Sequence, residues 1–295
     1  MFEGFVRHRI ANGPVEIHAL SAGSGPPLLL LHGYPQSHVM WHKVAARLAE
    51  RFTVVVADLR GYGESAKPRG EPDHANYSKR AMAQDQVEVM RALGFERFFL
   101  AGHDRGGRVS HRLAVDHPER VRKLMVLDIA PTLAMYEQTD MAFARAYWWW
   151  FFLIQPAPFP ETLIGSQPEF YLKAKIGYGK AGLAPFPADI YATYLRGVSN
   201  PEQVHAMCED YRAAASIDLE HDRADRAAGR GIQCPVHAIW GADGVVHRCF
   251  KPLEEWRKVT DAQYPVTGYA VPAGHYIAEE IPDRTVDEIE KFFGE

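Results

Sequence analysis

Four short apolar runs constrain this chain most strongly, because none of them alternates between apolar and polar side chains. They are PPLLLLHG, FTVVVADL, FFLAGH and KLMVLDI, at residues 26–33, 52–59, 98–103 and 123–129. Strands that are apolar on both faces belong in the middle of a covered sheet, and such sheets are mostly parallel. Amphipathic helical patterns at residues 40–52 and 77–95 separate the runs. The chain is therefore predicted to be an α/β protein with a mostly parallel central sheet flanked by helices.

This α/β pattern is interrupted in the middle of the chain. From residue 131 to residue 230 the strand patterns stop, and aromatic residues, prolines and helical segments replace them. The pattern resumes with PVHAIWG at residues 235–241 and ends with the helical DRTVDEIEKFF. We therefore expect a core built from residues 1–130 and 231–295, into which residues 131–230 are inserted as a helical cap.

Composition narrows the kind of partner. The 295 residues are 47% hydrophobic and 24% charged, with a net charge of -4 and no dense run of lysine and arginine. These values favour a globular protein that binds a small molecule over one that binds nucleic acid or a membrane surface. The start, MFEGFVRHRI, lacks the apolar region of a signal peptide, so we expect a cytoplasmic protein. The three cysteines, Cys208, Cys234 and Cys249, have no spacing typical of disulfides or zinc sites.

The stretch GHDRGG places Asp104 at a predicted turn between a buried strand and a helix. Gly102 and Gly106 lie two residues to either side, which lets the chain turn sharply and lift one side chain above the sheet edge. The alternative is that Asp104 only caps the following helix, a common role for aspartate. Two loops at the same sheet edge favour a functional turn: HGYP at residues 32–35 and DLRGYGES at residues 58–65.

A candidate base and two candidate acids accompany this turn. His275 follows the last predicted strand and precedes the last helix, where a histidine could reach Asp104. Asp128, at the end of a buried strand, or Asp243, in a later turn, could orient it. In the turn that commonly carries such an acid, the aspartate is the third residue after a glycine, and that position is Gly244 here. We therefore favour Asp128 and interpret Asp243 as a solvated turn residue.

With these motifs together, the chain resembles α/β-hydrolases that use an aspartate nucleophile, and among them the haloacetate dehalogenases. The resemblance covers nearly the whole length, and GHDRGGR is its most specific element. It implies that Asp104 attacks the carbon that bears the halogen, and that His275 and Asp128 then activate a water to hydrolyse the ester. The backbone amides of Tyr34 and Arg105 would form the oxyanion hole. No metal or organic cofactor is needed.

The resemblance also implies how substrate and halide are held. Arg105 and Arg108 would bind the carboxylate of a 2-haloacid, since arginine matches a carboxylate with paired donors. The leaving halide would lie among cap aromatics, at Trp149, Trp150 and Tyr211. Fluoroacetate-active members carry a histidine at the position of Trp149, so we expect activity on chloroacetate or bromoacetate and poor activity on fluoroacetate. The family further implies a homodimer.

Two alternatives use the same fold. An epoxide hydrolase would keep the aspartate and use two cap tyrosines to protonate the epoxide oxygen, and two arginines beside the nucleophile fit a neutral epoxide less well. The candidate tyrosines are Tyr147, Tyr191, Tyr194 and Tyr211. A non-catalytic binding protein would keep the pocket and lose one member of the catalytic set, and every member is present in this sequence.

Overall fold

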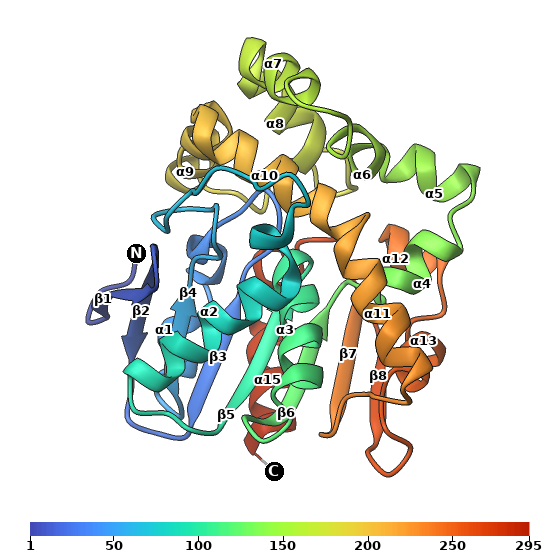
Figure 1. The fold of residues 1–295 in the computed structure, drawn as a ribbon. Coiled ribbons are helices and arrows are strands. Elements are labelled where there is room, and N and C mark those ends of the chain that lie inside the picture. The colour runs from blue at the N-terminus through green and yellow to red at the C-terminus, as the bar shows by residue number, and fades with distance from the viewer. Residues whose placement is uncertain (295) are drawn as a thin grey trace.

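A sheet of eight strands forms the centre of the computed structural model, which describes residues 1–294 (Figure 1). The strand order is β1-β2-β4-β3-β5-β6-β7-β8. β2 pairs antiparallel with β1 and β4, and all other neighbours are parallel, which confirms the predicted fold class. The strands are β1 (Val6–Asn12), β2 (Val15–Ala22), β3 (Pro27–Leu31), β4 (Thr53–Ala57), β5 (Phe98–His103), β6 (Val121–Leu127), β7 (Val236–Gly241) and β8 (Val266–Val271).

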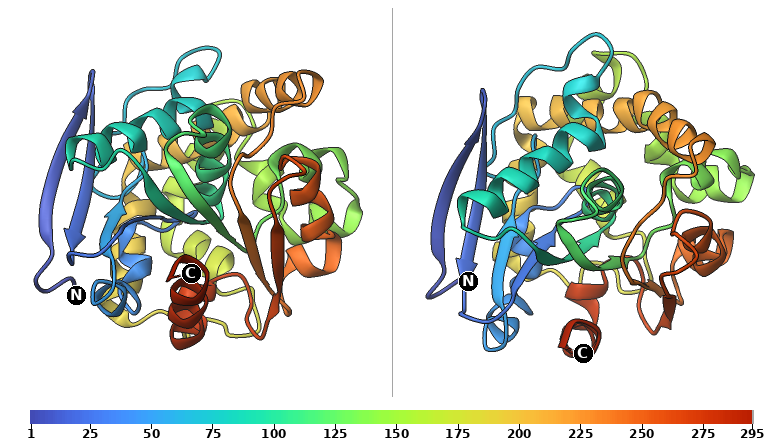
Figure 2. Two further views of the ribbon diagram at one scale, coloured as in Figure 1. Left: turned by 90° about the horizontal axis from the view of Figure 1, so that it is seen from below. Right: turned by 60° about the horizontal axis from the view of Figure 1, so that its bottom comes forward.

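The central strands are buried on both faces because successive side chains point to opposite sides of the sheet. In β3, Leu28 and Leu30 pack in one cluster with α1 and α15, whereas Leu29 and Leu31 pack in the other with α2 and α3. Figure 2 shows α15 on one side of the sheet and α2 and α3 on the other. The core helices are α1 (Ala45–Leu48), α2 (Lys79–Ala92), α3 (Arg105–Asp116), α12 (Val245–Cys249), α13 (Pro252–Lys258), α14 (Ile277–Glu280) and α15 (Pro282–Gly294).

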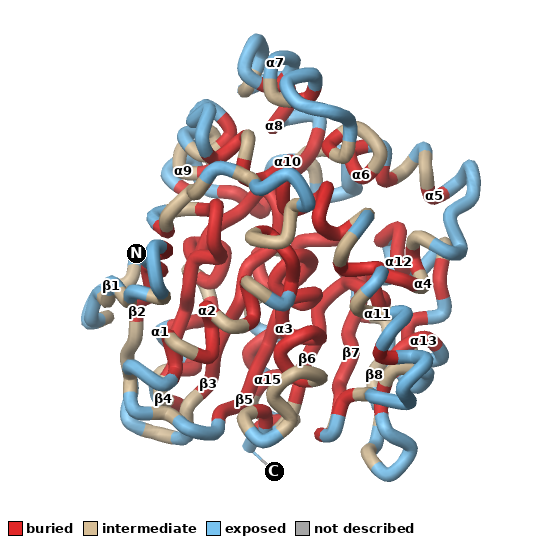
Figure 3. Tube along the Cα trace, in the orientation of Figure 1, coloured by how far each residue is buried: buried red, intermediate tan, exposed pale blue. Residues whose placement is uncertain are grey.

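Helices alone occupy the interval between β6 and β7, the segment that the sequence assigns to the cap. Most of them lie over the carboxyl ends of the central strands, and α11 runs down beside the core (Figure 1). Figure 3 shows that their buried sides face the sheet and their outer sides are exposed. They are α4 (Thr132–Glu137), α5 (Met141–Ala146), α6 (Trp148–Phe152), α7 (Phe159–Ser166), α8 (Pro168–Ile176), α9 (Ala188–Ser199), α10 (Pro201–Ala214) and α11 (Ile217–Ala227).

Two helices predicted in the first half of the chain have different outcomes. The helix after Ser78 is confirmed as α2, and the Ser78 hydroxyl accepts a hydrogen bond of 3.2 Å from the amide of Ala81. The helix expected at residues 40–52 is wrong in its extent, since only the 3-10 turn His38–Trp41 and the short α1 form there. Trp41 and Val44 are both fully buried, so packing against the core overrides the local helical pattern.

None of the helices within residues 1–294 is long and apolar enough to cross a bilayer.

Candidate active site

Asp104 directly follows β5, and its backbone has the unusual conformation of a tight turn. Its φ is 45° and its ψ is -113°, and its side chain makes no hydrogen bond to cap α3. A non-glycine residue with such a φ stores backbone strain, which is typical of residues held for function. The helix-cap alternative therefore does not describe this side chain, although it is 3% exposed and directly precedes the helix.

Glycines let the turn sit directly against the end of β3. A side-chain carbon on Gly106 would lie 2.5 Å from the carbonyl oxygen of His32, and one on Gly33 would lie 2.7 Å from the Cβ of Asp104. Neither position has room for a larger residue without moving the backbone. The GHDRGG and HGYP motifs are therefore one interlocked structure, and this close contact brings the Tyr34 amide to Asp104.

His275 and Asp128 lie beside Asp104, as the resemblance implies. The His275 Nδ1 is 2.6 Å from an Asp128 carboxylate oxygen, and its Nε2 is 3.8 Å from an Asp104 oxygen. The other Asp128 oxygen accepts a hydrogen bond of 3.0 Å from the Gly241 amide. Asp243 instead lies near the surface, 3.3 Å from the ammonium of Lys180. Of the two candidate acids, Asp128 is the one in contact with the histidine.

The charges of the site favour an ionised Asp104 and a basic His275. Burial opposes a charge on Asp104, but His275 and Arg108 outweigh it and hold the pKa of this carboxyl well below its usual range. Burial likewise opposes a charge on His275, yet the carboxylates of Asp104 and Asp128 raise the pKa of the imidazole above its usual value. Asp104 can therefore act as a nucleophile at any ordinary pH.

One of the two predicted oxyanion-hole donors, the Tyr34 amide, already binds the nucleophile. The Tyr34 amide donates a hydrogen bond of 3.1 Å to an Asp104 carboxylate oxygen. The same amide can follow that oxygen when the carboxylate becomes an ester and then a tetrahedral oxyanion. The second donor, the Arg105 amide, stays a prediction.

Arg105 is tied to a partner that the sequence did not indicate. Its guanidinium donates to both carboxylate oxygens of Asp210, at 2.9 and 2.6 Å, and stacks on the ring of Tyr211 with 4.1 Å between the guanidinium carbon and the ring centre. Lys79 is ion-paired with the same carboxylate. One nitrogen of Arg105, Nη1, is buried without a hydrogen-bond partner among the described residues. Arg105 therefore has one free nitrogen, Nη1, to offer a substrate rather than a free pair of nitrogens.

Arg108 is the less compensated of the two arginines. It donates to the carbonyl of Ala130 at 3.2 Å and to the hydroxyl of Thr132 at 3.0 Å, and within residues 1–294 no carboxylate forms an ion pair with it. Its Nε is buried without a partner among the described atoms. A buried cation with a free donor is costly unless an anion binds beside it. Arg108 is therefore suited to an anionic ligand.

Two of the predicted halide residues also present unused donors. The indole N–H of Trp150 and the hydroxyl of Tyr211 are both buried, and neither has a hydrogen-bond partner in the part of the chain that the structure describes. Trp150 stacks on the guanidinium of Arg108 at 4.6 Å. Buried donors normally find partners, so this group of unused donors indicates a site for an acceptor.

Trp149 has a different neighbour, the buried Lys175 of α8. The Lys175 ammonium lies 4.0 Å from the centre of the Trp149 ring and donates a hydrogen bond of 2.9 Å to the hydroxyl of Tyr276. Burial lowers the pKa of Lys175 to about 7, although the carboxylates of Asp104 and Asp128 partly oppose this. Lys175 was not predicted from the sequence, and it adds a second weakly compensated cation to the site.

Access to these residues is narrow. A pocket of about 20 Å³ opens beside His275, between Tyr178 of the α8–α9 loop and Gly244 of the core. A cavity of this size holds about one water molecule. The loop that carries Tyr178 therefore borders the site at His275, and the side chains of Asp104 and His275 are both buried.

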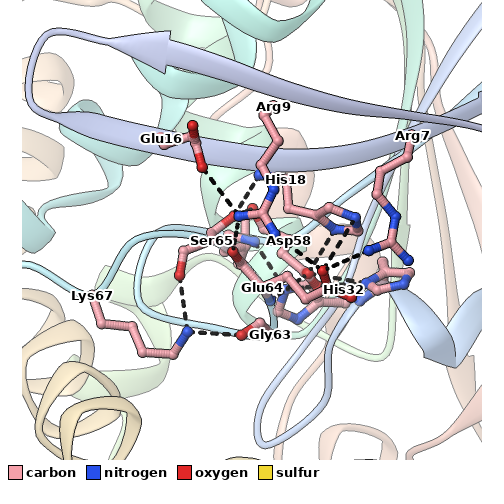
Figure 4. A network of polar contacts seen from close by, with 12 residues as sticks. Arg7, Arg9, Glu16, His18, His32, Asp58, Gly63, Glu64, Ser65 and Lys67 are labelled. Carbon is pink, nitrogen blue, oxygen red and sulfur yellow. Dashed lines mark hydrogen bonds and ion pairs between the residues drawn. The ribbon is translucent and has the colours of Figure 1, made fainter.

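A separate cluster of His18, His38 and Asp58 has ligand atoms within 4.8 Å of one another, a spacing that could suit a metal. The Asp58 carboxylate, however, already accepts hydrogen bonds from the amides of His38 and Glu64, at 2.7 and 2.9 Å, and from both imidazoles. Figure 4 shows His18 and Glu64 beside Asp58. The lone pairs that a metal would need are in use, so the cluster is better explained as a network that fixes the loop after β4.

Comparisons with known proteins agree with this geometry. A family model described as the alpha/beta hydrolase fold matches residues 26–257. A fluoroacetate dehalogenase from Burkholderia sp. is 48% identical to the chain, over 100% of this chain and 96% of that protein. A soluble epoxide hydrolase from Corynebacterium sp. strain C12 is 32% identical over 97% of this chain and 96% of its own length. A crystal structure of an α/β hydrolase from Nostoc sp. PCC 7120 has a TM-score of 0.95 and 52% identity over 99% of both chains.

Proposed function

This chain belongs to the α/β-hydrolase family, and we propose that it is a hydrolytic dehalogenase that converts a haloacetate to glycolate and halide. It is similar to a fluoroacetate dehalogenase over its full length and at higher identity than to an epoxide hydrolase. The enzyme class is therefore a hydrolase acting on carbon–halogen bonds. The nucleophile is Asp104, the base is His275 and the orienting acid is Asp128.

The reaction has two steps. An Asp104 oxygen attacks the carbon that bears the halogen, an ester bond forms, and the halide leaves with the bonding electrons. Water then attacks the ester carbonyl of Asp104 while His275 takes its proton, and the oxyanion is stabilised by the amides of Tyr34 and Arg105. Collapse of the oxyanion releases glycolate, whose alkoxide takes the proton back from His275, and the Asp104 carboxyl group, which now carries the oxygen and second proton of the water, loses that proton to solvent. A serine could not serve here, because its ether product would resist hydrolysis.

The observation that carries this proposal is the unused donor of Arg108 close to a buried carboxylate nucleophile. Arg108 influences the charge of Asp104 directly, and its recorded hydrogen bonds go to neutral groups. Arg108 forms no ion pair with a carboxylate of residues 1–294, and a substrate carboxylate would supply one. A neutral epoxide would leave this cation without an ion pair. The unused donors of Trp150 and Tyr211 would hold the halide.

A comparison of three substrates tests the proposal. We expect halide release from chloroacetate, and an efficiency lower by about 10²-fold or more for chloroacetamide, which lacks the carboxylate charge. Styrene oxide should not be hydrolysed at a comparable rate. Faster turnover of styrene oxide would support an epoxide hydrolase, in which Tyr147 and Tyr211 would be the acid pair. Binding of chloroacetate without turnover would support a non-catalytic member of the fold.

Trp149 is expected to limit activity on fluoroacetate. The Trp149→His variant should raise the ratio of fluoride to chloride release by about tenfold or more, since one well-aimed donor contributes on the order of 10² in rate. Fluoride and chloride electrodes measure the two products under the same conditions. Trp149→Phe is the matched control, because it keeps an aromatic face for Lys175 and adds no donor. Equal release of fluoride and chloride by the parent protein would contradict the assignment.

Acidic pH should separate the two chemical steps. Asp104 stays ionised because its pKa is held far below its usual range, so ester formation persists. Ester hydrolysis needs a neutral His275, whose charged form the surrounding carboxylates favour, so this step slows as the pH falls through the raised pKa of His275. We expect a burst of one halide per active site at pH 5, followed by slow turnover, in rapid-quench experiments. If there were no burst at low pH, ester formation and ester hydrolysis would both have slowed. This result would argue against a role for His275 in ester hydrolysis alone.

The cytoplasmic location is also a proposal, and so is the homodimer, which rests on the resemblance. Sedimentation analysis of the purified protein measures the oligomeric state. A monomer at assay concentration would remove the dimer from this account and leave the chemistry unchanged.

A further inference from the structure

A chain of buried polar side chains leads from the cap to the backbone of His275. The hydroxyl of Tyr194 in α9 donates to a Glu279 carboxylate oxygen at 2.9 Å. The Gln36 Nε2 faces the other Glu279 oxygen at 2.5 Å, and the Gln36 Oε1 faces His103 Nδ1 at 3.1 Å. The Nε2 of His103 is 2.8 Å from the carbonyl oxygen of His275. The four side chains are each at most 1% exposed.

The protons in this chain can be assigned from its His275 end. The carbonyl of His275 can only accept, so His103 Nε2 must carry the hydrogen. Burial and the neighbouring His275 lower the pKa of His103 to about 3, so the ring is neutral and its Nδ1 has no hydrogen. The Nδ1 of His103 must therefore accept a hydrogen bond, and only the NH₂ of Gln36 can donate it along this chain.

This assignment determines the state of Glu279. When the NH₂ of Gln36 faces His103, the carbonyl oxygen of the same amide faces Glu279. A half-turn of the amide exchanges its nitrogen and oxygen and gives this orientation. After that half-turn, the Gln36 carbonyl oxygen takes the place of Nε2, 2.5 Å from the Glu279 oxygen, and two oxygens at this distance form a hydrogen bond only when a proton lies between them. An amide carbonyl has none, so Glu279 must supply it. Glu279 is then a neutral carboxylic acid that donates to Gln36 and accepts from Tyr194.

The groups around Glu279 are consistent with a neutral acid. Burial raises its pKa to about 8, and the hydrogen bond from Tyr194 and the charge of Lys43 only partly oppose this. The nearest cation, Lys43 of the segment after β3, donates instead to the backbone carbonyls of Glu279 and Pro185, at 2.7 and 2.9 Å. The other titratable groups nearby are Glu280 of α14, whose charge raises the pKa of Glu279 further, and His103 and Tyr276 of the core, which are both neutral.

We propose that Glu279 is a positioning residue, which as a neutral acid orders Gln36 and His103 and so holds the loop that carries His275 against Asp104. The inference rests on the proposed function, because it takes His275 to be the base. Since Tyr194 belongs to the cap, the same chain also couples the closed position of the cap to the base. Deprotonation of Glu279 would place a carboxylate against the Gln36 carbonyl and break the chain.

The Glu279→Gln variant tests the proposal, because a glutamine amide donates to Gln36 and accepts from Tyr194 as a neutral acid would. In the parent, the folded state holds a proton that the unfolded state loses above about pH 4.5, so stability falls as the pH rises from 4.5 to 8. The variant lacks this loss. The quantity to compare is the melting temperature of the variant minus that of the parent. We expect this difference to be larger at pH 8 than at pH 5 by about 4 °C or more. An infrared C=O band of the protonated acid should be present in the parent below pH 8 and absent from the variant.

Glu280→Gln is the matched control on the same helix. The Glu280 carboxylate accepts hydrogen bonds from the amides of Gly274 and Tyr276, at 2.7 and 2.9 Å, so an amide there should lower the melting temperature. For activity, Glu279→Gln should keep kcat within about threefold at pH 7. Glu279→Ala should lower kcat about tenfold or more while the first-turnover halide burst persists, since His275 acts only on the ester.

The proposal would be overturned if the melting-temperature difference between the variant and the parent stayed constant or became smaller toward pH 8, and the parent lacked the infrared band. These two results would show that Glu279 is ionised. A Glu279→Ala variant with parental kcat would overturn the positioning role. Both outcomes are separate from the proposed function. If no haloacid is turned over by any variant, the dehalogenase proposal fails and with it the positioning role, whereas the melting and infrared measurements still decide the protonation of Glu279.

Discussion

Replacing Asp104 with alanine should abolish turnover of chloroacetate, with a loss in kcat on the order of 10⁴-fold or more. The loss is large because the nucleophile forms the covalent bond on which both steps depend, and removal of a nucleophile from a catalytic triad has costs of this size. The rate of halide release by the purified variant measures the effect. Glycolate binding should persist, since Arg108 and the cap aromatics are unchanged.

The same variant distinguishes a nucleophile from a helix cap. Asp104 makes no capping hydrogen bond, so the melting temperature of Asp104→Ala should stay near that of the parent. Asp140 is the matched control, because its carboxylate does cap α5 through a hydrogen bond of 2.8 Å to the amide of Phe143. Asp140→Ala should lose about 1 kcal/mol of stability and retain activity. If Asp104→Ala melted much earlier and kept even a hundredth of the activity, the catalytic role would be wrong.

The parts of the site that sequence motifs predicted are those with local causes. A tight turn needs small residues at fixed spacing, and GHDRGG forms it with Asp104 at its tip. The end of a buried parallel strand is readable from its apolar run, and Asp128 lies directly after β6. Where the chain must turn at a strand end, sequence and structure agree because neighbours along the chain decide the geometry.

The partners of the arginines could not be predicted, because they depend on contacts between distant segments. Asp210 reaches Arg105 across 105 residues of chain, and in CEDYRA it has the appearance of an ordinary helix charge. Lys173 and Lys175 illustrate the same limit within one helix. Lys173 has 53% of its side chain exposed and pairs with Glu169, whereas Lys175 is fully buried. Only the packing of α8 against the core distinguishes the two lysines.

His275→Asn should trap the covalent intermediate on Asp104. The variant keeps the nucleophile and the arginines but lacks the group that activates water, so ester formation continues while its hydrolysis slows by on the order of 10²- to 10⁴-fold. Intact mass spectrometry after mixing with bromoacetate should show the addition of one carboxymethyl group per chain. Peptide mapping should locate it on Asp104, and hydroxylamine should remove it, as expected for an ester and not for an alkylated thiol.

The Asp104→Ala/His275→Asn double variant is the control, because bromoacetate also alkylates exposed thiols such as the half-buried Cys249. Any label left in the double variant is this background reaction. His103 is the other histidine close to Asp104, but its low pKa and its bond to the His275 backbone make it unable to replace the missing base. If His275→Asn turned over at the parental rate with no ester, another group would have to activate the water. A hydroxylamine-sensitive adduct on a carboxylate other than Asp104 would instead reassign the nucleophile, and the strained turn that presents Asp104 would then have no catalytic explanation.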